Sequence, residues 1–301
     1  RDMGFFTALS SNGTLIGPDN IAAITEAGYG YVGISLDGIG ATHDRFRRKD
    51  GAFDASLAAV RLCRDRGLKV GVRFTMTMDN VHELPRMLEL IEREQIPRFY
   101  LSHLNYAGRG NTNRGSDAHH QATRAAMDLL FDACWDKVAR GEDSDFVTGN
   151  NDADGAYLLF WAARRFPEQV ERLKAKLEQW GGNASGVNVA NIDNLGNVHP
   201  DTFWWHHTLG NVRDRPFSDI WRDTSDPLMA GLKSRPRAIK GRCGACRHFA
   251  ICGGNAWFVA CVGRERQPET YFKRVGVELL EQTTFAPQPQ LQLGIAAQAL
   301  R

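Results

Sequence analysis

The sequence predicts an α/β fold, in which parallel strands form a sheet or barrel and a smaller cysteine-containing domain follows. Strand-like and helix-like segments alternate over residues 5–104, and this alternation is typical of βαβ units. Beyond residue 180 the composition shifts toward glycine and asparagine, and four of the six cysteines lie between residues 243 and 261. The first observation predicts the sheet, and the second predicts a separate domain with a metal site.

Four short runs of apolar and β-branched residues are predicted to be strands: Phe5–Leu9, Tyr31–Leu36, Lys69–Met76 and Phe99–Leu104. In folds of this kind, functional residues gather where strands end and loops begin. We therefore expect them in four segments: Ser11–Gly13, Ser35–Gly38, Thr75–Asn80 and Asn105–Gly110.

Helix signals separate these strands. Pro18 begins one helix that Gly28 ends, and a second helix over Asp54–Arg66 ends at Gly67. Asn80 is expected to cap a third helix that runs to about Glu94. Four βα units do not close a barrel, so we expect an open sheet or a barrel whose first strands are missing.

A domain boundary is expected near Trp180. Residues 117–180 are predicted to be mainly helical, whereas a β-hairpin is predicted around Asn194-Leu195-Gly196. Two short helices are expected next, over Pro216–Arg222 and Asp226–Ser234. The predicted domains are therefore 1–180 and 181–285, and the Pro- and Gln-rich segment 286–301 is expected to be a disordered tail.

Composition narrows the class of protein. Of the 301 residues, 43% are hydrophobic and 24% charged, and the net charge is +2, so we expect neither nucleic acid nor an anionic membrane as a partner. No apolar stretch approaches the roughly 20 residues of a membrane span. The chain opens on Arg1 without a signal-peptide pattern, so we expect a cytoplasmic protein in which clustered cysteines bind metal instead of forming disulfides.

The strongest local signal is the run Cys243-x2-Cys246-x5-Cys252. A CxxC turn brings two thiolates to one metal centre, and neighbouring arginines favour the thiolate form. The spacing allows a [4Fe–4S] cluster, a structural zinc site, or cysteines without metal. Cys261 is the nearby candidate for a fourth ligand, whereas Cys63 and Cys134 are expected to be buried helix residues.

Several motifs together resemble the radical S-adenosylmethionine (SAM) enzymes that carry a SPASM or Twitch extension. Ser11-Asn12-Gly13 resembles the end of the third strand of the SAM barrel, and Ser35-Leu36-Asp37-Gly38 with His43-Asp44 resembles the fourth-strand signature. The cysteine run resembles the ligands of the auxiliary cluster. The fold that this implies is a partial (β/α)6 barrel, without its first strands, and a C-terminal iron–sulfur domain.

Within this superfamily the sequence is most similar to the haem d1 biosynthesis (NirJ) family. The similarity is carried by Gly181–Gly186, Ala190–Gly196, Val198–Trp205, Leu209–Val212 and Cys243–Asn255. It implies a sirohaem-derived tetrapyrrole as substrate, whose propionate side chains are replaced by oxo groups, and an electron donor as partner. Arg109, His199, Trp204 and Trp205 are the candidates to contact the tetrapyrrole; the two tryptophans could equally pack over the cluster.

The resemblance also implies cofactors. SAM would bind at Ser11, Asn12, Gly13, Ser35 and Asp37, and an auxiliary [4Fe–4S] cluster at Cys243, Cys246, Cys252 and Cys261. A second cluster, which cleaves SAM in the intact enzyme, requires a CxxxCxxC motif that these 301 residues lack. Thr270 also stands where the family has a fourth auxiliary cysteine. The sequence therefore predicts an inactive fragment with a divergent C-terminal part.

Two other functions remain open from the sequence. A peptide-modifying radical SAM maturase would share the barrel and the cysteine run, although the segment Asp201–Trp205 argues against it. A non-enzymatic metal-binding remnant would reuse an incomplete barrel. An incomplete barrel would leave a sheet edge uncovered, so self-association through this edge is expected.

Overall fold

A computed structural model describes residues 3–142, 145–237, 239, 241–254, 291–293 and 300 of the chain. The chain forms two units. Unit 1 comprises residues 1–104, 113–148 and 292–297, and unit 2 comprises residues 105–112, 149–291 and 298–301. The domains predicted from the sequence, 1–180 and 181–285, divide the chain at a different place from these two units. They stay a prediction.

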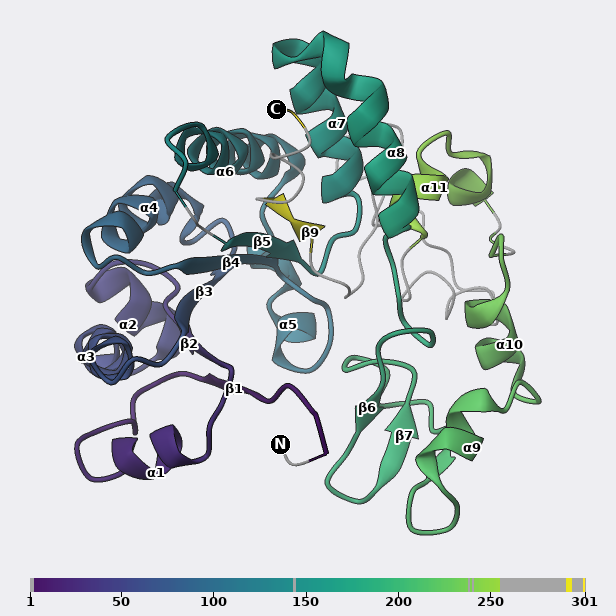
Figure 1. The fold of residues 1–301 in the computed structure, drawn as a ribbon, viewed down its shortest axis with the longest axis horizontal. Helices are drawn as coiled ribbons and strands as arrows, with labels where there is room; N and C mark the ends of the chain where they lie inside the picture. Colours follow the sequence, from purple (N-terminus) through teal and green to yellow (C-terminus); the bar gives the residue numbers. More distant parts are fainter. Residues whose placement is uncertain are drawn as a thin grey trace. The chain divides into compact units, whose positions relative to one another are not determined.

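Unit 1 is built on a parallel sheet. Strands β1 (Ala8–Ser11), β2 (Tyr31–Ser35), β3 (Val70–Met76) and β4 (Arg98–His103) pair in parallel in this order. The sheet continues with β5 (Asp145–Gly149) and β9 (Leu291–Gln292), the latter within the segment expected to be a disordered tail. Figure 1 shows the strands in sequence order across the sheet. The predicted α/β fold, with the topology of a partial barrel, is confirmed.

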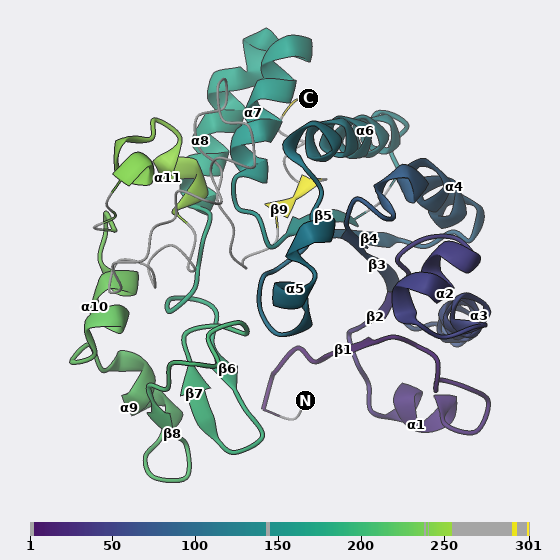
Figure 2. The same cartoon turned by 180° about the vertical axis from the view of Figure 1, so that it is seen from behind.

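Helices cover one face of this sheet (Figures 1 and 2). They are α1 (Ile21–Glu26), α2 (Ala41–Arg47), α3 (Ala52–Asp65), α4 (Leu84–Arg93) and α6 (His120–Ala139), with the 3₁₀ turns η1 (Val81–Glu83) and η2 (Arg114–Ser116). Alternate residues of each strand point toward them, because successive side chains of a strand point to opposite faces. In β3 these are Val70, Val72, Phe74 and Met76, all fully buried. The opposite face carries the polar residues described below.

Four details differ from the sequence predictions. The first strand begins at Ala8, and Phe5 and Phe6 before it are 66% and 76% exposed. Asn80 does not cap the helix that follows, because its side chain bonds to strand ends instead. Helix α2 and strand β5 were not predicted. Strand β5 was missed because five residues between long helical patterns carry too little alternation to be separated from them.

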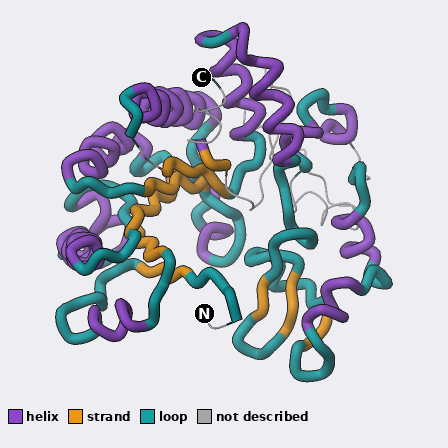
Figure 3. The backbone as a smooth tube through the Cα atoms, viewed as in Figure 1, coloured by secondary structure: helices purple, strands orange, loops and turns teal. Residues whose placement is uncertain are grey.

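Unit 2 contains helices and one small antiparallel sheet (Figure 3). The sheet consists of β6 (Asn191–Ile192), β7 (Asn197–His199) and β8 (Gly210–Asn211), and its first two strands form the predicted hairpin. The helices are α5 (Arg109–Thr112), α7 (Asp154–Arg165), α8 (Val170–Trp180, after the 3₁₀ turn η3, Pro167–Gln169), α9 (Phe217–Arg222), α10 (Pro227–Lys233) and α11 (Phe249–Cys252), with the 3₁₀ turn η4 (Gly241–Ala245).

Two of these helices form the support for the cysteine segment. Helices α7 and α8 pack side by side, and α11 lies against both (Figures 1 and 2). The helices expected over Pro216–Arg222 and Asp226–Ser234 are confirmed, and Asp226 caps the second by accepting from the backbone N–H groups of Leu228 and Met229. Within the described part of the chain, no helix combines the length and apolar character needed to cross a bilayer.

Candidate functional site

The first candidate region lies at the ends of strands β1 and β2. After β1, the Oγ of Ser11 accepts from the backbone N–H of Gly13 at 3.0 Å, and the Oδ1 of Asn12 accepts from that of Thr14 at 3.1 Å. Gly13 has a φ of +79°, and a Cβ there would lie 2.8 Å from Ile34. The segment therefore forms a tight turn whose polar side chains stabilise the turn itself.

Asp37 joins three elements just after β2. Its carboxylate accepts from the backbone N–H of Thr75 at 2.7 Å and forms an ion pair with Arg47. The Asp37 backbone N–H donates to the Nδ1 of His43 at 2.8 Å. Asp37 is fully buried, and burial raises the pKa of its carboxyl group while Arg47 opposes this shift. Both carboxylate oxygens of Asp37 are thus already bonded within the chain, so Asp37 holds the loop after β2 in place.

Asn80 was not among the residues proposed for the site, although it connects the same strand ends. Its Nδ2 donates to the carbonyl oxygens of Asp37 and Thr75 at 3.1 and 2.9 Å, and its Oδ1 accepts from the N–H of Thr77 at 2.7 Å. The signal in the sequence was the polar run Thr75–Asn80 after a strand. This bonding keeps the ends of β2 and β3 in one fixed arrangement.

The sheet face opposite the helices is polar. Ser35 and Arg73 are register partners on β2 and β3, so their side chains share this face. The Arg73 Nη1 donates to the Oγ of Ser10 at 2.5 Å, and its guanidinium lies over the Tyr100 ring at 4.7 Å. Arg98 lies likewise over Tyr31 at 4.7 Å. Arg73 was not predicted as a site residue. The sequence feature that could have indicated it is a single charged residue within an otherwise apolar strand.

The second candidate region is the cysteine segment of unit 2. The backbone N–H of Cys246 donates to the carbonyl of Cys243 at 3.2 Å, and the N–H of His248 donates to the Sγ of Cys246 at 3.4 Å. N–H groups directed at cysteine sulfur are among the features that tune iron–sulfur clusters. Across the residues that the structure describes, however, no group of three or more Cys, His, Asp or Glu side chains is close enough to hold a metal ion.

The backbone of residues 181–183 packs directly on the end of α11. The Asn183 N–H donates to the carbonyl of Cys252 at 3.0 Å. A Cβ on Gly182 would lie 2.0 Å from this same oxygen, and a Cβ on Gly253 would lie 2.3 Å from the carbonyl oxygen of Gly181. Close backbone packing therefore requires glycine at residues 182 and 253, each of which lies in a Gly-Gly-Asn segment.

A buried polar network continues from Asn183. Its Oδ1 accepts from the Nη1 of Arg237 at 2.7 Å, and its Nδ2 donates to Asp152 at 3.2 Å. Arg237 also donates to the carbonyl of Gly253 at 3.1 Å. Burial, with a smaller effect of Arg235, lowers the pKa of Arg237 to about 10. Burial, reinforced by Asp152, raises the pKa of the Cys252 thiol.

The four candidate substrate residues differ in environment. His199 is buried: its Nδ1 donates to the carbonyl of His207 at 2.8 Å, and its Nε2 lies 3.3 Å from Asp193. Trp204 is also buried, whereas Trp205 is 58% exposed and lies 5.6 Å from the His199 ring. Arg109 begins the short helix α5, and its side chain lies outside the described residues. Trp205 is therefore the candidate whose described side chain presents a flat exposed surface.

The remaining cysteines divide clearly. Cys63 in α3 and Cys134 in α6 are buried helix residues, as predicted. Burial raises the pKa of Cys134 to about 12. Cys261 and the segment Pro268–Tyr271 lie outside the described residues, so the expected fourth ligand stays a prediction.

Most of the chain is similar in sequence to known proteins. A family model of the radical SAM superfamily matches residues 1–91. The chain is 55% identical over 250 residues to the pre-heme d1 synthase of Dinoroseobacter shibae, a match that covers 82% of this chain and 62% of that protein. Residues 1–91 therefore carry a radical SAM domain.

Two further matches agree with this assignment. The Fe-coproporphyrin III synthase of Methanosarcina barkeri is 41% identical over 258 residues, covering 85% of this chain and 65% of that protein. The chain therefore spans less than two thirds of the length of either relative. The crystal structure of Streptococcus suis SuiB bound to precursor peptide SuiA has a TM-score of 0.64 at 16% identity, covering 88% of this chain and 57% of that one. This last likeness supports the radical SAM fold.

Proposed function

We propose that this chain belongs to an enzyme of haem d1 biosynthesis that replaces propionate side chains of a sirohaem-derived tetrapyrrole by oxo groups. The observation that carries the proposal is the 55% identity, over 82% of the chain, to a protein named pre-heme d1 synthase. The two candidate regions are compatible with it, because one offers a polar sheet face and the other a set of thiols.

SAM is proposed to bind at the strand ends and polar face of unit 1. Ser11, Asn12 and Gly13 form the turn after β1, and Ser35 lies on the polar face next to Arg73. Asp37 would act indirectly, by holding the loop after β2 in place. Bound SAM supplies the radical chemistry of the family; these residues would bind and orient it.

The auxiliary [4Fe–4S] cluster is proposed to bind Cys243, Cys246 and Cys252, with Cys261 as the fourth ligand. Thiolate sulfur suits such a cluster, and the N–H of His248 already points at one of the sulfurs. In a [4Fe–4S] cluster each thiolate binds a different iron, so the three sulfurs need not meet at one metal position. Cys243 and Cys246 lie near enough to Cys252 to add to the raised pKa of its thiol. Close packing on residues 181–183 holds Cys252 in place for this role.

The tetrapyrrole is proposed to contact Trp205, which exposes a flat ring. His199 would support this ring from beneath, Trp204 would hold the segment in place, and Arg109 would meet a carboxylate. These 301 residues contain no CxxxCxxC motif. We therefore propose that they do not cleave SAM on their own and that the reaction needs that cluster and an electron donor.

The experiment that tests the metal assignment is anaerobic reconstitution with iron and sulfide, followed by iron analysis and EPR. One cluster predicts about four irons per chain, with a large loss in Cys243→Ala and Cys246→Ala. Cys63→Ala is the matched control, because Cys63 is a buried residue of α3 in unit 1 and is not part of the cysteine run. Zinc in place of iron, or no metal, would contradict the cluster and favour a structural site or a remnant without chemistry.

The substrate is tested separately, by titrating the chain with an iron tetrapyrrole that carries carboxylate side chains. Trp205→Ala should weaken binding, whereas Trp221→Ala, a half-buried tryptophan of α9, should not. Tight binding of a leader-type peptide and none of the tetrapyrrole would favour a peptide maturase instead.

Self-association at the β1 edge is also proposed, because Met3, Phe5 and Phe6 are exposed beside it. A monodisperse monomer would contradict this proposal.

A further inference from the structure

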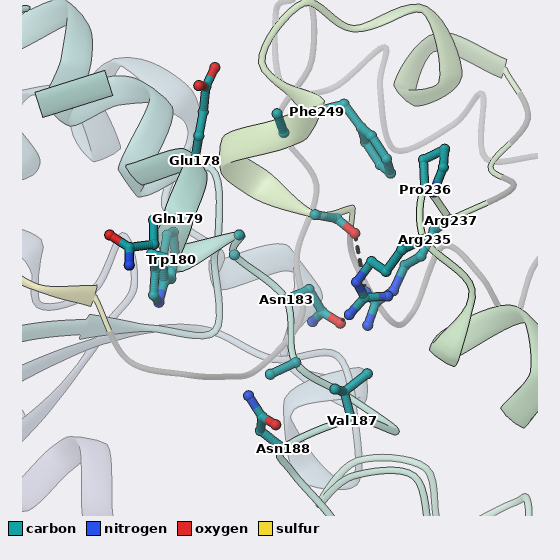
Figure 4. A pocket seen from close by; sticks show the side chains of 15 residues that line it. Glu178, Gln179, Trp180, Asn183, Val187, Asn188, Arg235, Pro236, Arg237 and Phe249 are labelled. Carbon is teal, nitrogen blue, oxygen red and sulfur yellow. Dashed lines mark hydrogen bonds between the residues drawn. The ribbon is translucent and has the colours of Figure 1, made fainter. Parts of the chain in front are cut away.

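Unit 2 contains a pocket whose residues the proposed chemistry does not use (Figure 4). Its volume is about 410 Å³, within the range of small-molecule sites. The walls come from the end of α8, from residues 181–184, from Arg235–Arg237 and from the first turn of α11. The pocket therefore lies beside the cysteine segment, within one unit of the chain.

Two arginines on one wall give this pocket a positive charge. Arg237 is 6% exposed, and it donates to neutral acceptors: the carbonyls of Leu232, Ser185 and Gly253 and the amide of Asn183. Across the described residues, no carboxylate forms an ion pair with Arg235 or Arg237. Asp152 acts on the charge of Arg237, although its carboxylate is bonded to Asn183. Glu178 in the lining pairs with Lys174 at 3.9 Å. Arg235 is exposed and pairs with no described carboxylate, so its charge is available to an anion.

Arg235 has the donors to bind that anion directly. Its Nη1 donates to the carbonyls of Leu232 and Ser234 at 2.9 and 2.8 Å. Its Nε and Nη2 form no hydrogen bond with the described part of the chain. These two atoms make up the edge of a guanidinium that grips a carboxylate with two parallel bonds. Arg61 uses the same two atoms to bind Glu94, at 2.9 and 2.7 Å.

The rest of the lining is suited to an apolar, flat group. Trp180 and Phe249 contribute rings to the wall, and Val187 and Pro236 contribute aliphatic surface (Figure 4). An inorganic anion would leave this surface in contact with water, whereas an unsaturated organic acid would cover it and gain the free energy of apolar burial. The pocket thus combines a guanidinium fork with an apolar slot.

We propose that this pocket binds a carboxylate carried on a flat, unsaturated organic group, with Arg235 gripping the carboxylate and Arg237 supplying a fixed positive field. One source is a carboxylate side chain of the tetrapyrrole, and this source rests on the proposed function. The other is a separate small aromatic acid, which does not depend on that function. The recognition chemistry is the same in both cases.

Isothermal titration of the full chain with 2-naphthoate tests the pocket. We expect binding that weakens at least about tenfold in Arg235→Gln, as for loss of a charge-assisted bidentate pair. The matched control is Arg213→Gln, an exposed arginine outside the pocket, which should bind as the unaltered chain does. The neutral analogue 2-naphthamide should bind at least tenfold more weakly. Equal binding by Arg235→Gln or by 2-naphthamide would overturn the proposal, as would inorganic phosphate binding as tightly as 2-naphthoate.

Competition distinguishes the two sources. An iron porphyrin with free carboxylate side chains should displace 2-naphthoate, and its methyl ester should not, if the substrate side chain enters the pocket. Arg235-dependent binding of 2-naphthoate that the porphyrin does not disturb would support the separate acid. If the chain binds 2-naphthoate but no porphyrin, the proposed tetrapyrrole substrate is refuted while the pocket stays supported. Failure of the proposed function can therefore be distinguished from failure of the pocket proposal.

Discussion

The backbone N–H of Asn183 donates to the carbonyl oxygen of Cys252 at 3.0 Å, joining two segments far apart in the sequence. The same asparagine holds Arg237 with its side chain, and Arg237 donates in turn to the carbonyl of Gly253. Cys252 is therefore fixed from two directions. The position of the third cysteine depends on residues 181–183 as much as on its own helix.

Gly182→Ala should disrupt this junction. The glycine has a φ of +66°, and a Cβ would lie 2.0 Å from the Cys252 oxygen, so we expect a loss of about 3 kcal/mol in the free energy of unfolding. Iron bound after reconstitution should fall as well. Gly231→Ala is the control, since α10 leaves open space around this glycine and the change should stay within about 1 kcal/mol. Similar stability in the two variants would contradict the close packing.

His43 should make the protein less stable in mild acid. Burial lowers the pKa of this histidine from 6.5 to about 4, so between these values the unfolded chain binds a proton that the folded chain does not. The free energy of unfolding should therefore fall as pH drops from about 6.5 to 4, by up to about 3 kcal/mol from this group. Urea unfolding across this range measures the effect.

His43→Asn is the variant that isolates this group, because the Asn oxygen can still accept from the Asp37 N–H. Its stability should decline less on acidification than that of the unaltered chain. His82→Asn, at an exposed position, should decline as the unaltered chain does. Parallel pH profiles for all three proteins would show that His43 does not carry the effect.

Asp201 should make the protein less stable as the pH rises, which is the opposite of the effect of His43. Its carboxylate accepts from the Oγ of Ser185 at 2.6 Å, and burial raises its pKa from 3.8 to about 6. A raised pKa stabilises the protein in acid, and this contribution is lost as pH rises through about 6. Asp201→Asn removes the buried charge, so it should raise stability at pH 7.5 by up to about 3 kcal/mol, with a smaller gain at pH 5. Asp50→Asn, on the exposed surface, should change little; a loss of stability in Asp201→Asn at pH 7.5 would refute the assignment.

The sequence predicted the features that depend on local pattern. A run rich in Val and Thr predicted a strand over Lys69–Met76, and β3 is observed over Val70–Met76. Long-range partners have no local pattern: Arg237 meets Asn183 across 54 residues. Arg73 was missed for the same reason: its partners Ser10 and Tyr100 lie on other strands, far away in the sequence. Phe5 and Phe6 have strand propensity, yet the pairing of β1 begins only at Ala8.

The five described thiols should fall into two classes when the apo chain is alkylated with iodoacetamide. Cys63 and Cys134 are fully buried, and burial raises the pKa of both thiols, so they should react only after unfolding. Cys246 is partly exposed and followed by Arg247, so it should react first. Cys243 is buried and burial raises the pKa of the Cys252 thiol, so these two should also react slowly in the apo chain. Reconstitution with iron and sulfide should then protect Cys246, because a cluster ligand is no longer a free nucleophile. Mass spectrometry resolves each site. Alkylation of Cys246 at the same rate before and after reconstitution would contradict its role as a cluster ligand.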